Sequence, residues 1–321
     1  MVSAMQNEMV VLGRSELDSL AIGWADVVDV LDDAFAQKAK GLVQNPPKPA
    51  VRPRRDAFIN AMPAYLGGSD RVGIKWVAGF EQNRAKGLPY IYGVFVLSDA
   101  DTGRPLALID GGWITEMRTA GATGVVLRHV PGRPSVLAIV GAGLQGRRHA
   151  ELILEMRPGI EEVRVFDVEP AATEALLTQI GDRRAVVAAS PEEAVEGADL
   201  IVTAVTVPLG EGRLTGATTA DDALLLPVDY DDAMGPSVAA EASLYVVDDP
   251  GQYASVQELH FAGFREPDGE LAQVVAGEIE VPDHGRRVFL NMGIAMDDVA
   301  LGARVYDLAR ERGIGRSIAF P

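Results

Sequence analysis

The feature that most constrains this 321-residue chain is a glycine-rich turn between an apolar strand and a helix, in the segment SVLAIVGAGLQGRRHAELIL. Gly141 lets the chain turn tightly, Gly143 lets the backbone approach a pyrophosphate, and Gly146 lets the helix pack closely on the strand. Leu144 and Gln145 open the helix, whose amino terminus favours phosphate oxygens. The G-x-G-x-x-G pattern alone is common, but with a strand before it and a helix after it, it predicts a dinucleotide site.

An acidic residue, Asp167 in VRVFDVEP, ends the next predicted strand. It lies somewhat further along the chain than the ~20 residues that usually follow such a turn. A carboxylate at this place accepts hydrogen bonds from the ribose hydroxyls and repels a 2′-phosphate. Val168 and Glu169 stand where an NADP site often has arginine. The pattern favours NAD over NADP, and the alternative is an aspartate with a solvated surface position.

After residue 134, short apolar strands alternate with helical segments. The predicted strands are Ser135–Val140, Val163–Asp167, Ala185–Ala188, Leu200–Val205, Ala223–Val228 and Leu244–Val247. This repetition predicts an α/β fold with a Rossmann-type, doubly wound parallel sheet. The first third mixes a helix at Ala25–Lys40 with a β-hairpin around DADTGR and further apolar strands. A second, α+β domain is therefore expected, as the length also suggests.

Composition and motifs exclude several classes of function. A net charge of −17 opposes a general nucleic-acid surface, and the absence of cysteine excludes disulfides and a cysteine nucleophile. The four histidines show no metal-ligand spacing and G-x-S-x-G is absent, so we expect neither a metal nor a serine hydrolase. No apolar run reaches the ~18 residues of a membrane helix. We see no signal peptide, so the cytoplasm is the expected location.

Five segments appear in an order that resembles a known family. They are INAMPAYLGG, GIKWVAGF, DTGRPLALIDGGWITEMRTAGATG, VGAGLQGRRHAELI and FLNMGIAMDDVALGARVYDLA. Together they resemble the ornithine cyclodeaminase/mu-crystallin family over nearly the whole chain. The resemblance implies an NAD(P)-binding homodimer. It also implies that residues 1–130, rejoined by residues 295–321, form the substrate and dimerisation domain, with residues 131–294 as the NAD-binding domain.

The resemblance implies a cationic clamp for a substrate carboxylate. Arg118 in ITEMRTAG is similar in position to the family arginine that grips this carboxylate in a bidentate manner. Lys75, between Ile74 and Trp76, resembles the family's substrate lysine. The alternatives are a salt bridge on a helix surface for Arg118 and a solvent-facing strand position for Lys75.

A further cation is expected upstream of Met62. Arg52 is our choice, although its spacing to Met62 is short and Lys48 or Arg54 would also serve. Met62 is expected to line the substrate pocket, with a place in the core as the alternative.

The acid/base is expected after a Rossmann strand, where cyclodeaminases have a stretch resembling hxNxxGxD. This chain has LLLPVDYDDAMGP instead, and by position we select Asp231, with Asp229 second. Thr206, after LIVTAV, is expected to face the cofactor by resemblance. Asp297 and Asp298 are interpreted as carboxylates in the first turn of a helix, where the helix dipole favours them.

These residues predict hydride transfer between the α-carbon of a small L-amino acid, or its imine, and NAD. If water attacks the imine the enzyme is an amino-acid dehydrogenase, and in reverse it is an imine or ketimine reductase. If a side-chain amine attacks, ammonia leaves and the enzyme is an ornithine cyclodeaminase that recycles NAD. The departure from hxNxxGxD slightly favours a dehydrogenase or reductase. A non-catalytic NAD(P)-binding protein and a two-substrate amino-acid synthase remain as alternatives.

Overall fold

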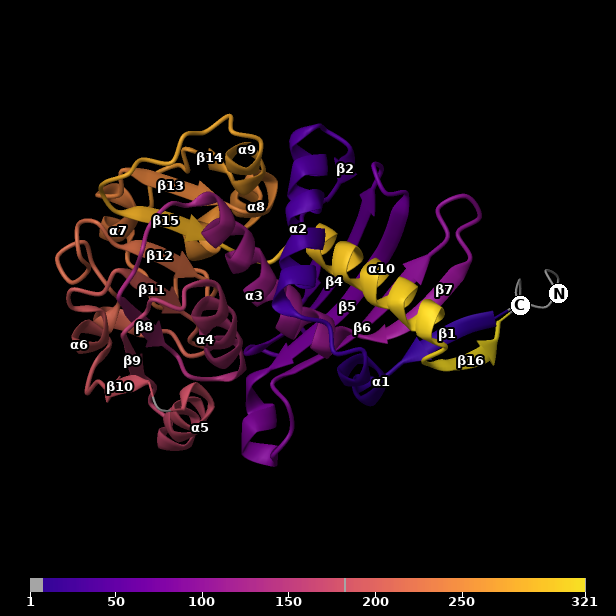
Figure 1. Ribbon diagram of the computed structural model, residues 1–321, viewed down its shortest axis with the longest axis horizontal. Helices are drawn as coiled ribbons and strands as arrows, with labels where there is room; N and C mark the ends of the chain where they lie inside the picture. The colour runs from indigo at the N-terminus through magenta and orange to yellow at the C-terminus, as the bar shows by residue number, and fades with distance from the viewer. Residues whose placement is uncertain (1–7, 182, 321) are drawn as a thin grey trace. The chain divides into compact units, whose positions relative to one another are not determined.

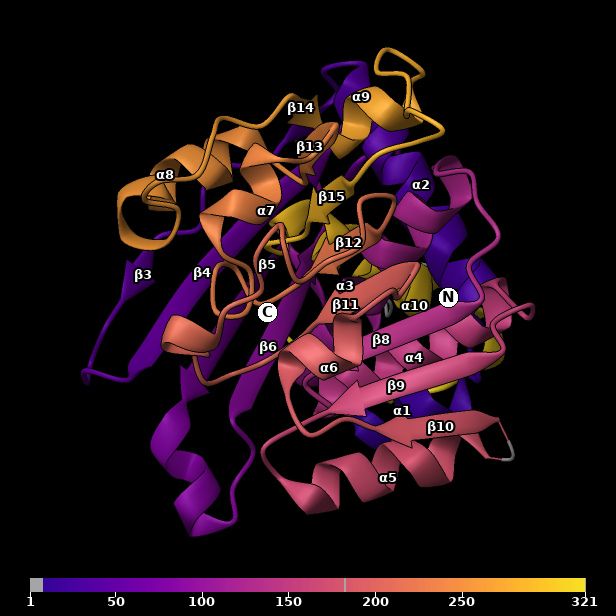
Figure 2. The same ribbon diagram turned by 90° about the vertical axis from the view of Figure 1, so that its left-hand side faces the viewer.

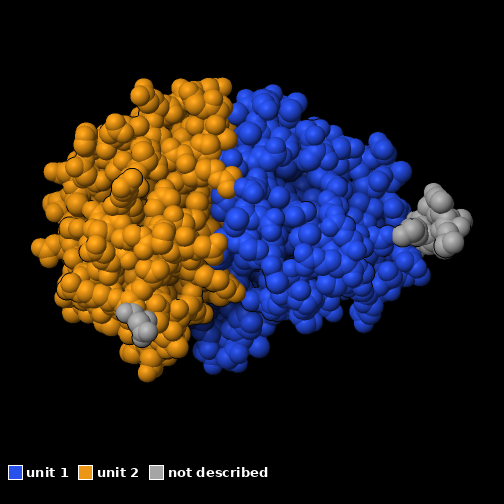
Figure 3. Space-filling view, in the orientation of Figure 1, with its two compact units in different colours: residues 1–118, 294–321 blue, residues 119–293 orange. Residues whose placement is uncertain are grey.

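The computed structural model describes residues 8–181 and 183–320. The chain divides into two compact units: unit 1 is Met1–Arg118 with Ile294–Pro321, and unit 2 is Thr119–Gly293 (Figure 3). This division differs from the boundary expected at residue 130, because it falls inside helix α3 (Gly111–His129). Proline and glycine mark the end of that helix in the sequence, whereas tertiary contacts assign its first turns to unit 1 and its last turns to unit 2.

Unit 1 is built on a mixed sheet in the order β16-β1-β7-β6-β5-β4-β2, with β3 beside β4. Its strands are β1 (Glu8–Leu12), β2 (Val43–Gln44), β3 (Ala50–Val51), β4 (Ala57–Leu66), β5 (Arg71–Phe80), β6 (Ile91–Ser98), β7 (Pro105–Asp110) and β16 (Arg316–Ala319). Its remaining elements are α1 (Arg14–Ser19), α2 (Trp24–Ala39), the 3-10 helix η2 (Glu81–Lys86) and α10 (Ala295–Arg312). Helix α10 packs against β4, β5, β6 and α2 (Figure 1). The predicted hairpin is confirmed as the antiparallel pair β6–β7.

The two faces of the unit 1 sheet differ in character. Along β5, Lys75 and Val77 are buried, whereas Ile74 and Trp76 are exposed. Met62 of β4 is paired with Lys75 and is buried as well. Because paired residues of neighbouring strands share a face, Met62 and Lys75 both lie on the covered side of the sheet.

Unit 2 is built on a second sheet in the order β10-β9-β8-β11-β12-β15-β13-β14, and its described strand pairs are parallel. Its strands are β8 (Val136–Val140), β9 (Glu162–Phe166), β10 (Arg184–Val187), β11 (Leu200–Thr203), β12 (Leu224–Pro227), β13 (Leu244–Val247), β14 (Gly269–Glu270) and β15 (Arg287–Leu290). Its helices are α4 (Leu144–Met156), α5 (Pro170–Ile180), α6 (Pro191–Val195), η3 (Gly210–Gly212), α7 (Pro236–Ala240), α8 (Pro250–His260) and α9 (Leu271–Val275). The parallel sheet confirms the predicted doubly wound α/β fold.

The strand order reverses direction between β8 and β11. From β8 the chain proceeds to β9 and β10 on one side, and then crosses to β11 and β12 on the other (Figure 2). In open α/β sheets, ligands bind beyond the carboxyl ends of the strands at such a switch point. The loops that follow β8 and β11 approach closely, since a Cβ on Gly141 would lie 2.6 Å from the carbonyl carbon of Ala204. The sheet therefore places the glycine-rich turn at the expected ligand position.

Candidate functional site

Two cations of unit 1 share one buried carboxylate. Lys75 Nζ lies 2.6 Å from Asp298 Oδ1, and Arg118 Nε donates to the same oxygen at 3.1 Å. Lys75 and Asp298 are fully buried, and Arg118 is 6% exposed. The terminal nitrogens Nη1 and Nη2 of Arg118 have no partner among the described residues, nor does the buried Oδ2 of Asp298. The cluster thus holds an arginine fork that is free to take a carboxylate.

The pKa of Lys75 is lowered to about 7, mainly by burial and also by the neighbouring charges of Arg118 and Lys48, which together outweigh the opposing effect of Asp298. Lys48 is therefore an upstream cation that acts on this cluster. Arg52, our sequence-based choice, has an exposed side chain with no described hydrogen bond or ion pair. Arg52 directly follows β3 and is exposed there.

The glycines of unit 2 form a cradle at the start of α4. A Cβ on Gly146 would lie 1.9 Å from the carbonyl oxygen of Gly141, so only glycine lets the helix approach the strand. Gly141 has a φ of +98°, which a residue with a side chain rarely adopts. A Cβ on Gly143 would meet no atom of the protein within 4 Å. Protein packing therefore does not require glycine at position 143, whereas the close approach of a pyrophosphate would, and the cradle fits a dinucleotide.

Asp167 follows β9 and is tied to the glycine turn. Its Oδ2 accepts a hydrogen bond from Ala142 N–H at 2.7 Å, and its Oδ1 accepts one from Glu169 N–H at 2.8 Å. These bonds fix the carboxylate beside the cradle and leave each oxygen a further lone pair for a ribose hydroxyl. Leu144 at the start of α4 is 49% exposed, and Thr206 is exposed in the loop after β11. Both lie at the switch point, where sequence analysis expects cofactor contacts.

A buried polar chain supports the first turns of α4. His149 Nδ1 lies 2.8 Å from the carbonyl oxygen of Gln145, and His149 Nε2 lies 3.1 Å from Thr123 Oγ1. Asn291 Nδ2 donates to the same Thr123 oxygen at 3.3 Å. Burial lowers the pKa of His149 to about 4, so the imidazole is neutral at pH 7. This neutral ring joins Gln145 to α3 and β15 without adding a charge near the cradle.

Two of the three aspartates after β12 are engaged in structural contacts. Asp229 is buried and accepts hydrogen bonds from Thr203 Oγ1 at 2.7 Å and from Val205 N–H at 2.9 Å. Burial raises its pKa to about 7 despite these bonds. Asp231 lies 3.2 Å from Arg213 Nη1 and 3.1 Å from His260 Nδ1. Both candidates for the acid/base therefore have partners that tie them to loops of unit 2.

The third aspartate, Asp232, has a side chain with no described hydrogen bond or ion pair. The pKa of Asp232 is raised to about 6, mainly by burial and also by the charge of Asp231, against the opposing charges of His260 and Arg213. Tyr230 has a φ of +58°, in the left-handed region that glycine favours. If the glycine of hxNxxGxD is placed at Tyr230, its asparagine falls at Pro227 and its aspartate at Asp232. Counted in this way, the pattern reaches Asp232, one residue after Asp231.

The sequence did not indicate that Asp298 pairs with two cations, that the charge of Lys48 acts on Lys75, or that Asp232 is a partly buried carboxylate. Asp298 does lie in the first turn of α10, as interpreted, but its carboxylate pairs with two cations rather than serving the helix dipole alone. Its signal was indirect: a lysine inside an apolar strand requires a buried partner. For Asp232, the spacing of hxNxxGxD counted from Pro227 was the available signal.

Among the described residues, no group of histidine and acidic side chains is placed to hold a metal ion. None of the described helices combines the length and the apolar character needed to cross a membrane.

Known proteins resemble the whole chain. It is 30% identical to the nodulation efficiency protein NfeD of Rhizobium meliloti over 316 residues, which cover 96% of this chain and 98% of that protein. The Δ1-pyrroline-2-carboxylate reductase of Thermococcus litoralis, solved with NADH and L-proline, gives a TM-score of 0.86 at 26% identity and covers 97% of this chain and 100% of its own. An archaeal alanine dehydrogenase dimer with bound NAD gives a TM-score of 0.86 at 26% identity, and the match covers 98% of this chain and 100% of that chain. The ornithine cyclodeaminase/mu-crystallin family profile matches residues 7–313, and the chain belongs to this family.

Proposed function

We propose that this protein is an NAD-dependent enzyme that acts on the α-carbon of a small L-amino acid or its imine, as a dehydrogenase or reductase. The observation that carries the proposal is the buried pair of Lys75 and Arg118 around Asp298, with the arginine fork unpartnered. Two buried cations with one carboxylate between them leave a net positive charge, which suits a substrate carboxylate. The solved reductase and alanine dehydrogenase relatives support the same substrate class.

NAD is the cofactor we assign, and it would be held by the cradle of unit 2. Gly141, Gly143 and Gly146 allow the pyrophosphate to approach α4, and Asp167 accepts hydrogen bonds from a ribose. Asp167 disfavours NADP, because its carboxylate repels a 2′-phosphate. When bound, the nicotinamide supplies the redox chemistry by accepting or donating the hydride.

Arg118 and Lys75 orient the substrate. The Nη1 and Nη2 atoms of Arg118 take the two carboxylate oxygens, while Asp298 fixes the guanidinium through Nε. Lys75 adds a second positive charge when it is protonated. Such positioning can lower a barrier by about 7–11 kcal/mol, because the reactants no longer lose their freedom of motion during the reaction.

Asp232 is the acid/base that we propose, in place of Asp231 or Asp229. A pKa of about 6, raised by burial, lets its carboxylate exchange a proton with an amine near neutral pH. Asp232→Asn is expected to lower kcat by about 10²–10⁴-fold, the usual contribution of general acid–base catalysis. Asp231→Asn is the matched variant and is expected to retain most activity. If steady-state kinetics instead shows a larger loss of kcat in Asp231→Asn than in Asp232→Asn, the acid/base is Asp231.

The proposal is tested by recording NADH and ammonia together, with purified protein, NAD and a panel of L-amino acids. NADH rising in step with ammonia identifies a dehydrogenase of a primary amine. NADH without ammonia identifies a secondary amine such as proline, hence an imine reductase in reverse. Ammonia without NADH identifies a cyclodeaminase. Bound NAD with no turnover of amino acids, of imines with NADH, or of paired amino acids would sink the proposed activity.

We also propose that the protein is a homodimer formed through the uncovered face of the unit 1 sheet. Ile74 and Trp76 of β5 and Tyr92 of β6 are 38%, 48% and 48% exposed on this face. Contiguous exposed apolar groups of this kind mark protein interfaces, and the alanine dehydrogenase relative is a dimer. Trp76→Glu is expected to give a monomer in light scattering coupled to size-exclusion chromatography. A native protein that is monomeric at high concentration would contradict this assignment.

A further inference from the structure

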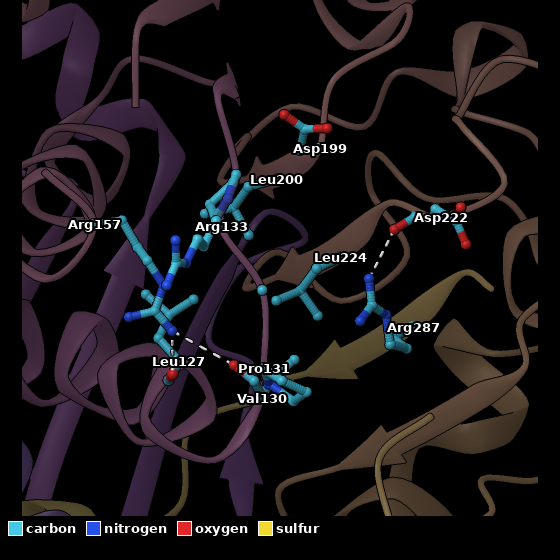
Figure 4. Close-up of a pocket in the computed structure, with 12 residues that line it drawn as sticks. Leu127, Val130, Pro131, Arg133, Arg157, Asp199, Leu200, Asp222, Leu224 and Arg287 are labelled. Atoms are coloured by element: carbon cyan, nitrogen blue, oxygen red, sulfur yellow. Dashed lines mark hydrogen bonds between the residues drawn. The ribbon is translucent and has the colours of Figure 1, made fainter. Parts of the chain in front are cut away.

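A pocket of about 140 Å³ lies in unit 2 at the amino ends of the parallel strands, whereas the dinucleotide cradle lies at their carboxyl ends. It is lined by residues at the amino ends of β11, β12 and β15 and by the connection that follows α3 (Figure 4). Its charged lining residues are Arg133, Arg157, Asp199, Asp222 and Arg287. None of these residues takes part in the cradle or the aspartate loop described above, and the pocket therefore requires its own explanation.

Two of the arginines are held by backbone carbonyls instead of carboxylates. Arg157 Nη2 donates to the carbonyl oxygens of Leu127 and Val130 at the end of α3. Arg287 is 8% exposed, and its Nη2 donates to the carbonyl oxygen of Asp222 at 2.8 Å. Burial lowers the pKa of both arginines. Carbonyl dipoles orient both guanidinium groups, but a carbonyl carries no full opposing charge. The charges of Asp222 and Asp283 also act on Arg287 and partly oppose the effect of its burial, whereas the pKa of Arg157 is lowered by burial alone.

The donors of the pocket are incompletely used. The buried Nε of Arg287 has no hydrogen-bond partner among the described residues. Arg133, in the connection after α3, has an exposed side chain with no described hydrogen bond or ion pair. Arg133 offers its N–H groups to a ligand at the exposed side of the pocket, while the unpartnered Nε of Arg287 lies buried in the wall. Planar guanidinium groups match the oxygens of phosphate.

The two acidic residues of the pocket already have partners. Asp199 Oδ2 accepts hydrogen bonds from Ser135 N–H at 2.8 Å and from Val136 N–H at 2.9 Å. Asp222 Oδ1 accepts one from Gly285 N–H at 2.5 Å. Neither carboxylate forms a described ion pair with an arginine of the pocket. The lining therefore carries three positive and two negative charges, in a chain whose net charge is −17.

We propose that this pocket is a binding site for a phosphate group, held by Arg133, Arg157 and Arg287. A tetrahedral anion has enough oxygens to accept from several guanidinium groups, and it supplies the negative charge that the carbonyls lack. The ligand is either free inorganic phosphate or the phosphate of a small ester. The site lies apart from the cradle on the same sheet, and the proposal does not depend on the reaction that the enzyme catalyses.

The test is a calorimetric titration of the full chain with inorganic phosphate, at constant ionic strength and with NAD present to fill the cradle. Arg133→Gln removes one charge and two donor groups at an exposed position, so the fold is expected to be kept. The matched control is Arg310→Gln, which removes the same charge at an exposed position of α10 in unit 1. We expect phosphate to bind about tenfold more weakly to Arg133→Gln than to the native protein or the control.

A parallel titration with glycerol 3-phosphate separates the two sources of the phosphate group. Tighter binding of the ester assigns a phosphate monoester, and tighter binding of the ion assigns free phosphate. Two results would overturn the site: no binding of either probe to the native protein, or equal binding to Arg133→Gln, which would place the anion elsewhere.

Discussion

The cation cluster of unit 1 and the glycine cradle of unit 2 are built in opposite ways. The cluster joins side chains from β5, α3 and α10, and its two ion pairs bridge 223 and 180 positions of sequence. The cradle uses main-chain groups within one turn, where Gly146 packs against Gly141 five residues earlier. The cluster is rich in charge, whereas the cradle offers space and peptide N–H groups.

This difference shows how each site responds to change. Removing one member of a buried ion cluster leaves an uncompensated charge, whose cost is several kcal/mol. Replacing a glycine of the cradle by alanine lowers the stability only where the new Cβ clashes with neighbouring atoms. Such a clash is expected at Gly146 and not at Gly143. The predictions below test this contrast, starting with the largest expected effect.

Asp298→Asn is expected to lower the free energy of unfolding by about 3–5 kcal/mol, because Lys75 and Arg118 lose their buried counter-charge. The control on the same helix is Asp307→Asn, whose partly exposed pair with Arg71 contributes about 0–1 kcal/mol. Urea denaturation measures both. Asp298 raises the pKa of Lys75, because the carboxylate stabilises the protonated amine. The stabilisation of the fold by the Asp298–Lys75 pair is therefore present below about pH 7 and fades as the pH rises above this value. A loss of stability as small as that of Asp307→Asn would contradict the cluster.

Arg118→Lys keeps the charge but removes the planar fork. We expect kcat/KM to fall by about 10- to 100-fold, as for the loss of a hydrogen bond to a charged group. Arg71→Lys, in the partly exposed pair of unit 1, is the matched control and should leave kcat/KM unchanged. Steady-state kinetics decides this, and unaltered efficiency in Arg118→Lys would remove this arginine from the substrate site.

Gly146→Ala is expected to destabilise unit 2 by about 1–3 kcal/mol, since its Cβ would overlap the Gly141 carbonyl oxygen. Gly143→Ala should leave thermal stability within about 0.5 kcal/mol but weaken NAD binding, because its Cβ occupies space reserved for the pyrophosphate. Calorimetric titration with NAD, together with thermal unfolding, separates the two effects. Equal stability losses in both variants would refute the distinction between packing and ligand glycines.

Binding of a carboxylate inhibitor is expected to weaken as the pH rises above about 7, because the pKa of Lys75 is lowered to about 7 by burial. Below this pH the ammonium form attracts the carboxylate, and above it the neutral amine does not. The decrease should approach about tenfold per pH unit at most. The guanidinium fork of Arg118 still contacts the carboxylate, so some affinity persists. Lys75→Met should abolish the dependence, and a persistent dependence in this variant would assign it to another group.

Sequence reasoning performed well where the signal was local. The strand, turn and helix around Gly141–Gly146, the following Asp167 and the alternating elements of unit 2 are visible in the chain and predict the parallel sheet. Site residues whose surroundings come from distant segments of the chain were harder to predict. Arg52 was chosen over Lys48 by its place in the sequence, but the charge that acts on Lys75 is that of Lys48. Asp231 was chosen by counting, and we propose Asp232 in its place because Tyr230 has the left-handed backbone that the glycine of the family pattern favours.

The resemblance to the family suggested the proposed carboxylate clamp, whereas the sequence by itself determined the doubly wound sheet and the glycine cradle. These follow from hydrophobic periodicity and from the steric freedom of glycine, which act over a few residues. Only the tertiary structure decided that Asp298 pairs with both Lys75 and Arg118, and that Asp229 and Asp231 are occupied by structural contacts. Pairing of buried charges depends on which distant elements pack together, because electrostatic interactions act through space rather than along the chain.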